Sequence, residues 1–146
     1  MSSIGMDEMC LAKLTEGQKK AFLRAFIKMA NVDGHVDNYE RDFIQKMAID
    51  FGLFIDDMDQ FLKDINLDEI IADVASIKDR RVALELLKQL CVLAHADHVL
   101  SDDEVVFIGS IGQAMGIDPE KVEEISHWVI DYLVWNEQGK LIFEEV

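Results

Sequence analysis

The chain has 146 residues and a formal net charge of −15 at neutral pH, because 29 aspartates and glutamates outnumber 14 lysines and arginines. A chain of this length can form one domain that buries about two thirds of its unfolded surface. The negative charge opposes binding to nucleic acid and to anionic lipid, which requires lysine and arginine side chains. We therefore exclude nucleic acid as a partner and expect cationic ligands, either divalent metals or basic protein segments.

Two cysteines, Cys10 and Cys91, are too few for a disulfide framework and too far apart for a metal motif. The N-terminus lacks a basic segment followed by an apolar run. No apolar stretch reaches the roughly eighteen residues that a membrane span requires. We therefore expect a reduced, cytoplasmic protein with no direct insertion into a membrane.

Apolar residues recur at intervals of three and four along the chain, which predicts an all-α fold. After a short first helix, a longer one begins at a capping box made by Thr15 and Gln18. The next helix begins at a second box, Asp37 with Glu40, and stops at Gly52, a residue suited to the left-handed conformation. The helices expected in this half cover about 7–13, 15–29, 37–51, 57–65 and, capped by Asn66, 67–76.

The second half predicts the same layout: a long helix, a capping box made by Ser101 and Glu104, and a helix that stops at Gly116. Pro119 opens the last helix, which runs through its apolar residues to about position 135. A short tail over 137–146 follows. This tail could pair as a strand, dock on the helices or contact another copy, and the pattern does not decide among these alternatives.

An internal repeat underlies this layout, because residues 64 positions apart are identical at six places without an insertion. The identical pairs are Ala30 and Ala94, Asp33 and Asp97, Glu40 and Glu104, Phe43 and Phe107, Ile44 and Ile108, and Gly52 and Gly116. We therefore predict a single domain over 1–146, with a first repeat over about 15–65 and a second over about 79–136.

In the first repeat, Ala30, Asp33 and Gly34 form an Ala-x-x-Asp-Gly turn that precedes a helix cap and Glu40. Two copies of this arrangement in an acidic helical chain resemble the TerB-like family of tellurite-resistance proteins and of N-terminal domains of DnaJ-type co-chaperones. The resemblance covers about 21–135 and implies about seven helices in two pseudo-twofold halves. It also implies a setting in stress or tellurite resistance, with protein partners in a membrane-associated complex.

The repeated acidic pairs, Asp33 with Glu40 and Asp97 with Glu104, are the candidate site. The resemblance implies that these four residues bind metal. Carboxylate oxygens suit calcium or magnesium better than zinc. Each loop alone supplies too few oxygens for a cation that takes about six to eight, so we hypothesise that the two halves pool their carboxylates. Because a histidine replaces the glycine in the second repeat, the two loops are not equivalent.

Other interpretations of these residues stay open. The glutamates can act only as capping residues, which describes a metal-free structural adaptor, or the carboxylates can serve a metal-dependent hydrolase. His95 and His98 give a weaker zinc alternative. No nucleophile with an adjacent base is recognisable, and Cys91 lies in an apolar stretch where a thiol is inert. We therefore predict a non-catalytic binding module.

A protein partner is expected for this module, and a homo-oligomer stays open. The candidate contact patch surrounds Gly52, where several apolar residues exceed what one turn usually buries. The two tryptophans, Trp128 and Trp135, are expected in the core or at an interface and not around a cofactor. We expect some of the apolar residues in this stretch to be exposed: Phe51, Leu53, Phe54 and Ile55.

Overall fold

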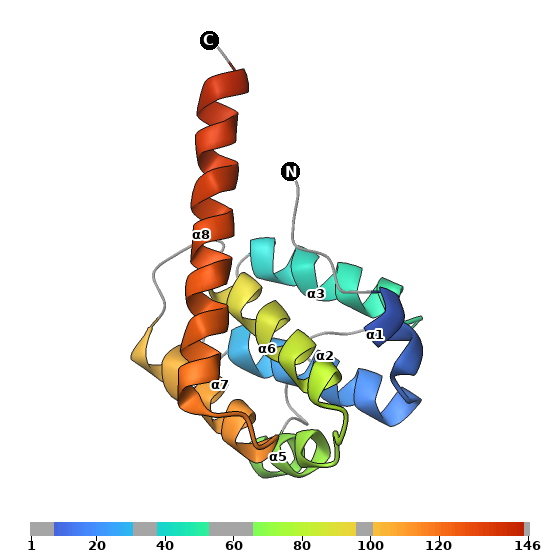
Figure 1. Cartoon of the computed structure of the whole chain (residues 1–146). Coiled ribbons are helices and arrows are strands. Elements are labelled where there is room, and N and C mark those ends of the chain that lie inside the picture. The colour runs from blue at the N-terminus through green and yellow to red at the C-terminus, as the bar shows by residue number, and fades with distance from the viewer. Residues whose placement is uncertain (1–7, 31–37, 53–65, 96–100, 145–146) are drawn as a thin grey trace.

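The computed structural model describes residues 8–30, 38–52, 66–95 and 101–144 (Figure 1). Within these residues every regular element is a helix, which confirms the all-α prediction. The expected helix over 57–65 lies outside the described residues. The described helices are α1 (Glu8–Lys13), α2 (Glu16–Ala30), α3 (Asn38–Asp50), α5 (Leu67–Ala75), α6 (Arg80–His95), α7 (Asp102–Ala114) and α8 (Pro119–Phe143).

Helix α6 is the centre of the fold, since it contacts α1, α2, α7 and α8. From Val82 to Ala94 only Leu84 and Lys88 are partly exposed, and every other residue of this stretch is buried. Leu86, Leu87 and Leu90 are completely buried, and even Glu85 and Gln89 are only 1% exposed. The remaining helices therefore pack around α6 as a common core.

Helix α2 forms the other large part of the core and packs against α3, α5 and α6. Aromatic rings join α2 to α3 through edge-to-face contacts, the geometry that the ring quadrupole favours. The ring centroid of Phe26 lies 5.8 Å from that of Phe43, and Phe22 lies 6.1 Å from Phe51. Because the rings of Phe22 and Phe26 also meet, at 6.4 Å, one aromatic cluster fixes the α2–α3 pair.

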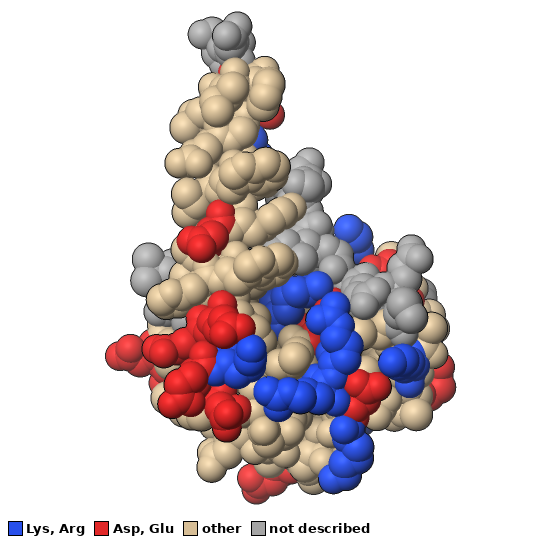
Figure 2. All heavy atoms as spheres, in the orientation of Figure 1, with Lys and Arg blue, Asp and Glu red and all other residues tan. Residues whose placement is uncertain are grey.

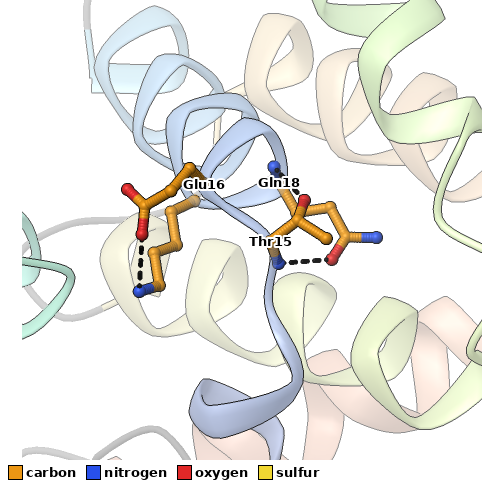
Figure 3. Close-up of polar contacts among 4 residues, drawn as sticks. Thr15, Glu16 and Gln18 are labelled. Atoms are coloured by element: carbon orange, nitrogen blue, oxygen red, sulfur yellow. Dashed lines mark hydrogen bonds and ion pairs between the residues drawn. The ribbon is translucent and has the colours of Figure 1, made fainter.

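The predicted capping boxes are confirmed where the structure describes them. Figure 3 shows the backbone N–H of Gln18 donating to the Thr15 hydroxyl at 3.1 Å, while the Thr15 N–H donates to the Gln18 side chain at 3.0 Å. These bonds satisfy two amides that the first turn of α2 leaves without a helical partner. Asn66 caps α5 as expected, since its side chain accepts from the Asp68 N–H at 2.8 Å.

The predicted glycine stops are also confirmed. Gly52 follows α3 with φ of +71° and Gly116 follows α7 with φ of +75°, the left-handed region that only glycine enters without strain. After α7, the N–H of Ile117 donates to the Gly112 carbonyl at 2.9 Å, which closes the helix end. Both helices therefore end at the repeated glycine.

The last helix differs from the prediction, because α8 continues through Gly139 to Phe143 and the region expected as a separate tail is helical to that point. One glycine inside a helix costs only about 1 kcal/mol relative to alanine. An ion pair one turn apart, from Lys140 to Glu137 at 3.1 Å, supports the helix across this position. The glycine therefore weakens α8 without ending it.

Helix α8 rises away from the other helices toward its C-terminal end (Figure 1). Its N-terminal half contacts α6 and α7, and Val129 is its one completely buried residue. None of the helices in the described part of the chain is long and apolar enough to cross a membrane.

Both cysteine thiols are expected to be unreactive in the folded protein. Cys10 and Cys91 are buried, and burial raises the pKa of the Cys91 thiol to about 12. Because the thiolate is the reactive form, Cys91 stays protonated and inert at neutral and mildly alkaline pH. Titration with a thiol reagent should detect neither cysteine before denaturation and both after it. A Cys10→Ala variant should show one reactive thiol after denaturation. Rapid labelling of the folded chain would contradict this assignment.

Candidate functional site

The structure describes two of the four carboxylates of the candidate metal site. Glu40 lies in the first turn of α3 and Glu104 in the first turn of α7, and they are only 6% and 3% exposed. Asp33 and Asp97 lie outside the described residues, as does Asp37 of the first repeat's expected capping box. The pooling of four carboxylates therefore stays a prediction.

Several other repeated pairs have matching environments. Ala30 and Ala94 are both buried at the ends of α2 and α6, and Ile44 and Ile108 are both buried within α3 and α7. The repeated glutamates are thus held at equivalent places, each at the N-terminus of a helix that packs on a long core helix. The pseudo-twofold relation of the two halves stays a prediction.

Glu104 has a clear structural role. The Ser101 N–H donates to the Glu104 carboxylate at 2.9 Å, and the Glu104 N–H donates to the Ser101 hydroxyl at 3.2 Å, which confirms the predicted box. A carboxylate in the first turn also faces the positive end of the helix dipole. Capping alone therefore accounts for a carboxylate at this position, whether or not a cation also binds.

The described residues contain no group of three or more histidine, cysteine, aspartate or glutamate side chains that could hold a metal ion. A cation site at Glu40 and Glu104 would therefore need ligands from beyond the described ranges. For the zinc alternative, His95 already has a neighbour: its Nε2 lies 2.7 Å from the Ser126 hydroxyl of α8. His98 lies outside the described residues.

The apolar patch expected around Gly52 is only partly tested. Phe51 is 2% exposed and packs on Phe22, so it belongs to the core and is not available to a partner. Phe51 is therefore not among the exposed residues of the expected patch, because its ring packs in the aromatic cluster between α2 and α3. Leu53, Phe54 and Ile55 lie outside the described residues.

Most of the exposed large apolar side chains in the described part of the chain lie instead on α8. Trp128 is 53% exposed and Trp135 70%, although their residue type makes a buried position the usual one. Further exposed apolar side chains follow to the end of the helix: Ile130, Val134, Leu141, Ile142 and Phe143. Such a concentration on one element marks an interaction site more often than a passive surface.

A pocket with charged and apolar lining residues adjoins this surface at the base of α8. It has a volume of about 360 Å³ and is lined by residues of α6 and α8: Arg81, Leu84, Glu85, Lys88, Lys121, Glu124, Ile125 and Trp128. Figure 2 shows lysine and arginine side chains gathered on the face below the projecting part of α8, beside a cluster of acidic side chains. Trp128 belongs to both the pocket and the exposed apolar surface.

Ion pairs organise the pocket. The buried Glu85 carboxylate lies 2.8 Å from the Lys88 ammonium and 3.9 Å from the Arg81 guanidinium. Across the pocket, Lys121 lies 2.7 Å from Glu124. The lining residues thus include three cations and two carboxylates, an excess of one positive charge in a chain whose net charge is −15.

Comparison of the chain with protein-family models, with curated proteins and with solved structures finds no match. The resemblance to the TerB-like family therefore depends on the residues of this chain alone.

Substitutions of Glu104 should separate its capping role from its charge. Glu104→Ala removes the acceptor for the Ser101 N–H and should lower the free energy of unfolding by about 1 kcal/mol. Glu104→Gln keeps an acceptor oxygen, since glutamine also completes a capping box, and should lose much less. Urea denaturation of both variants measures the difference. Equal losses would show that the carboxylate charge, and not the cap, stabilises this helix end.

Proposed function

We propose that this chain is a non-catalytic binding module that recognises a protein partner through the projecting helix α8. The observation that supports this most directly is the exposure of both tryptophans on that helix, Trp128 at 53% and Trp135 at 70%. Aromatic side chains of this size dominate the energetics of protein interfaces. Burial of these two side chains against a partner would remove their apolar area from water, which is favourable.

The spacing on α8 indicates the chemistry of the partner. Trp128, Tyr132, Trp135, Gly139 and Ile142 follow one another at alternating intervals of four and three, and we call these five residues the α8 stripe. This interval pattern is that of a helix which packs along another helix. The partner we propose is therefore an amphipathic helix that lies along the α8 stripe.

The setting follows from the family resemblance alone. We propose a role in stress or tellurite resistance, in a complex associated with membranes. The acidic composition supports partners that carry basic segments, because the net charge of −15 attracts them at long range.

We also propose that a divalent cation, calcium or magnesium, binds near the repeated acidic pairs. The burial of Glu40 and Glu104 at helix N-termini supports this, because carboxylates held out of bulk water bind a hard cation with little reorganisation. Asp33 and Asp97, on the preceding turns of the sequence, would supply further oxygens.

A photo-crosslinking experiment tests the proposed partner site. A photoreactive phenylalanine analogue at position 135 should give discrete crosslinked proteins in cells, because Trp135 lies in the centre of the α8 stripe. The matched control carries the same group at Gln113, which is exposed on α7. Because both sites are exposed, both variants should have the same thermal unfolding midpoint as the native chain. Equal crosslinking from the two positions, or none from position 135, would overturn the proposed function.

Thermal unfolding with a chelator and with calcium tests the cation site. A cation at about a hundredfold its dissociation constant should stabilise by about 2.7 kcal/mol, or about 5–10 °C for this chain length. The rise should disappear in the double variant Glu40→Gln, Glu104→Gln, which keeps capping acceptors but loses two charges. An unchanged midpoint in the native chain would contradict cation binding and leave the glutamates as capping residues.

A further inference from the structure

We propose that the partner helix is the α8 of a second copy of this chain, so that two α8 helices pack antiparallel and form a symmetric dimer. In this pair the C-terminal end of each helix lies at the basic pocket of the other copy. The inference rests on the proposed function of α8 and identifies the partner. Spacing, a helical glycine, charge and buried area each support it.

The pocket and the α8 stripe lie on one face of the helix. Lys121, Trp128, Trp135 and Ile142 are separated by seven residues each, so they occupy the same position of a heptad and lie in one line along α8. Ile125 lines the pocket and falls four residues after Lys121, which continues the alternation of the stripe. A helix that packs on the stripe therefore runs directly into the pocket.

An antiparallel arrangement centred on Trp135 matches large residues with small ones. Trp128 of one copy then lies opposite Ile142 of the other, and Tyr132 lies opposite Gly139. Knobs-into-holes packing needs such complementary sizes. The register is self-complementary, as an interface with twofold symmetry requires.

Gly139 supports this register independently. A glycine in the middle of a helix is destabilising by about 1 kcal/mol, yet a Cβ added at Gly139 would meet nothing within 4 Å in the single chain. Close packing within one copy therefore does not explain this residue. In the antiparallel pair, the missing side chain leaves room for Tyr132 of the second copy.

Charge complementarity favours the same orientation. The pocket at the base of α8 is lined by Arg81, Lys88 and Lys121 against the carboxylates of Glu85 and Glu124, so its lining carries one excess positive charge. The far end of α8 carries Glu144 and the negative end of the helix dipole. Antiparallel packing places this negative end opposite Ser126, one turn from the pocket, whereas parallel packing would place like ends together.

The apolar area is large enough for a dimer. Aromatic side chains bury about 150–250 Å² each, so Trp128, Trp135 and Phe143 expose about 300–500 Å² per copy at their observed exposures. Two copies would cover about 600–1,000 Å² with these residues alone, and Ile142 adds to this. A specific interface needs about 1,000 Å² or more in total.

Sedimentation and fluorescence of the purified chain test the dimer. The chain contains only two tryptophans, and both lie on the stripe. Raising the concentration should convert monomer into a species of twice the mass, with a matching blue shift of the tryptophan emission. Trp135→Asp should weaken the dimer by roughly thirtyfold or more. Val134→Asp is the matched control, because Val134 is 51% exposed next to the stripe and should leave the dimer intact.

A charge exchange tests the antiparallel register. Lys121→Glu and Glu144→Lys should each weaken the dimer by roughly fivefold in low salt, because the altered contact occurs twice. The double variant should recover the native affinity. Within one chain these two residues lie about 35 Å apart along α8, far beyond the Debye length of about 10 Å. A non-additive effect of the two substitutions on the dimer affinity can therefore arise only from contact between copies. Additive losses would overturn the register.

The outcomes separate this inference from the proposed function. A chain that stays monomeric at every concentration, while position 135 still crosslinks to a protein of different mass, overturns the dimer and leaves α8 as a site for another helix. A monomer with no crosslink from position 135 overturns both. Dissociation by Val134→Asp with no effect of Trp135→Asp would also overturn the dimer as proposed.

Discussion

The burial of α6 is the constraint on which the rest of this structure depends. From Val82 to Ala94 only Leu84 and Lys88 are partly exposed, and both line the pocket beside α8. Exposing the apolar residues of this helix to water would carry a large cost, so four described helices pack on it. Glu85 lies among these helices as a buried carboxylate, and it is held at the pocket rim by Lys88 and Arg81. The central helix thus also organises the basic pocket.

The length of α6 limits how much of α8 the core can stabilise. At about 1.5 Å per residue, α6 spans about 24 Å and α8 about 37 Å, so α8 is about 13 Å longer than the central helix on which it packs. Isolated helices of a few turns are marginal in water, because each turn lacks tertiary contacts. The projecting part of α8 is therefore the element whose order depends most on a partner. The exposed area of its aromatic side chains also favours contact with a partner.

The sequence was most informative where the signal is local. Capping boxes at Thr15 and Ser101 and stops at Gly52 and Gly116 depend on residues within one turn, so the sequence predicted these helix ends correctly. Where the outcome depends on tertiary contacts, the sequence left alternatives open. It indicated that some of the four apolar residues around Gly52 are exposed, and only the structure shows that a ring of a different helix covers Phe51.

At the end of α8 the prediction is wrong. The sequence analysis ended the last helix at about position 135, but local helix propensity and the ion pair from Lys140 outweigh the one glycine, Gly139, that follows. The four-and-three spacing of the α8 stripe was readable in the sequence. Whether such a stripe faces the core or water depends on how far the neighbouring helices extend along α8, and the sequence of α8 itself does not show this. For the acidic pairs, sequence locates Glu40 and Glu104 at helix starts but gives no distance between the two halves.

The projecting helix resolves a difficulty that the composition creates. Two chains of charge −15 repel one another, and an interface on the body would bring many carboxylates together. From Trp128 to Phe143, α8 carries only Asp131, Glu137 and Lys140 as charged residues, so self-association along this part of the helix brings few charges together. In the proposed antiparallel pair the contact is made through these helix segments and not through the acidic faces of the two bodies. Salt screens the repulsion between the bodies beyond about 8 Å at physiological ionic strength, whereas the attraction at each pocket acts at short range.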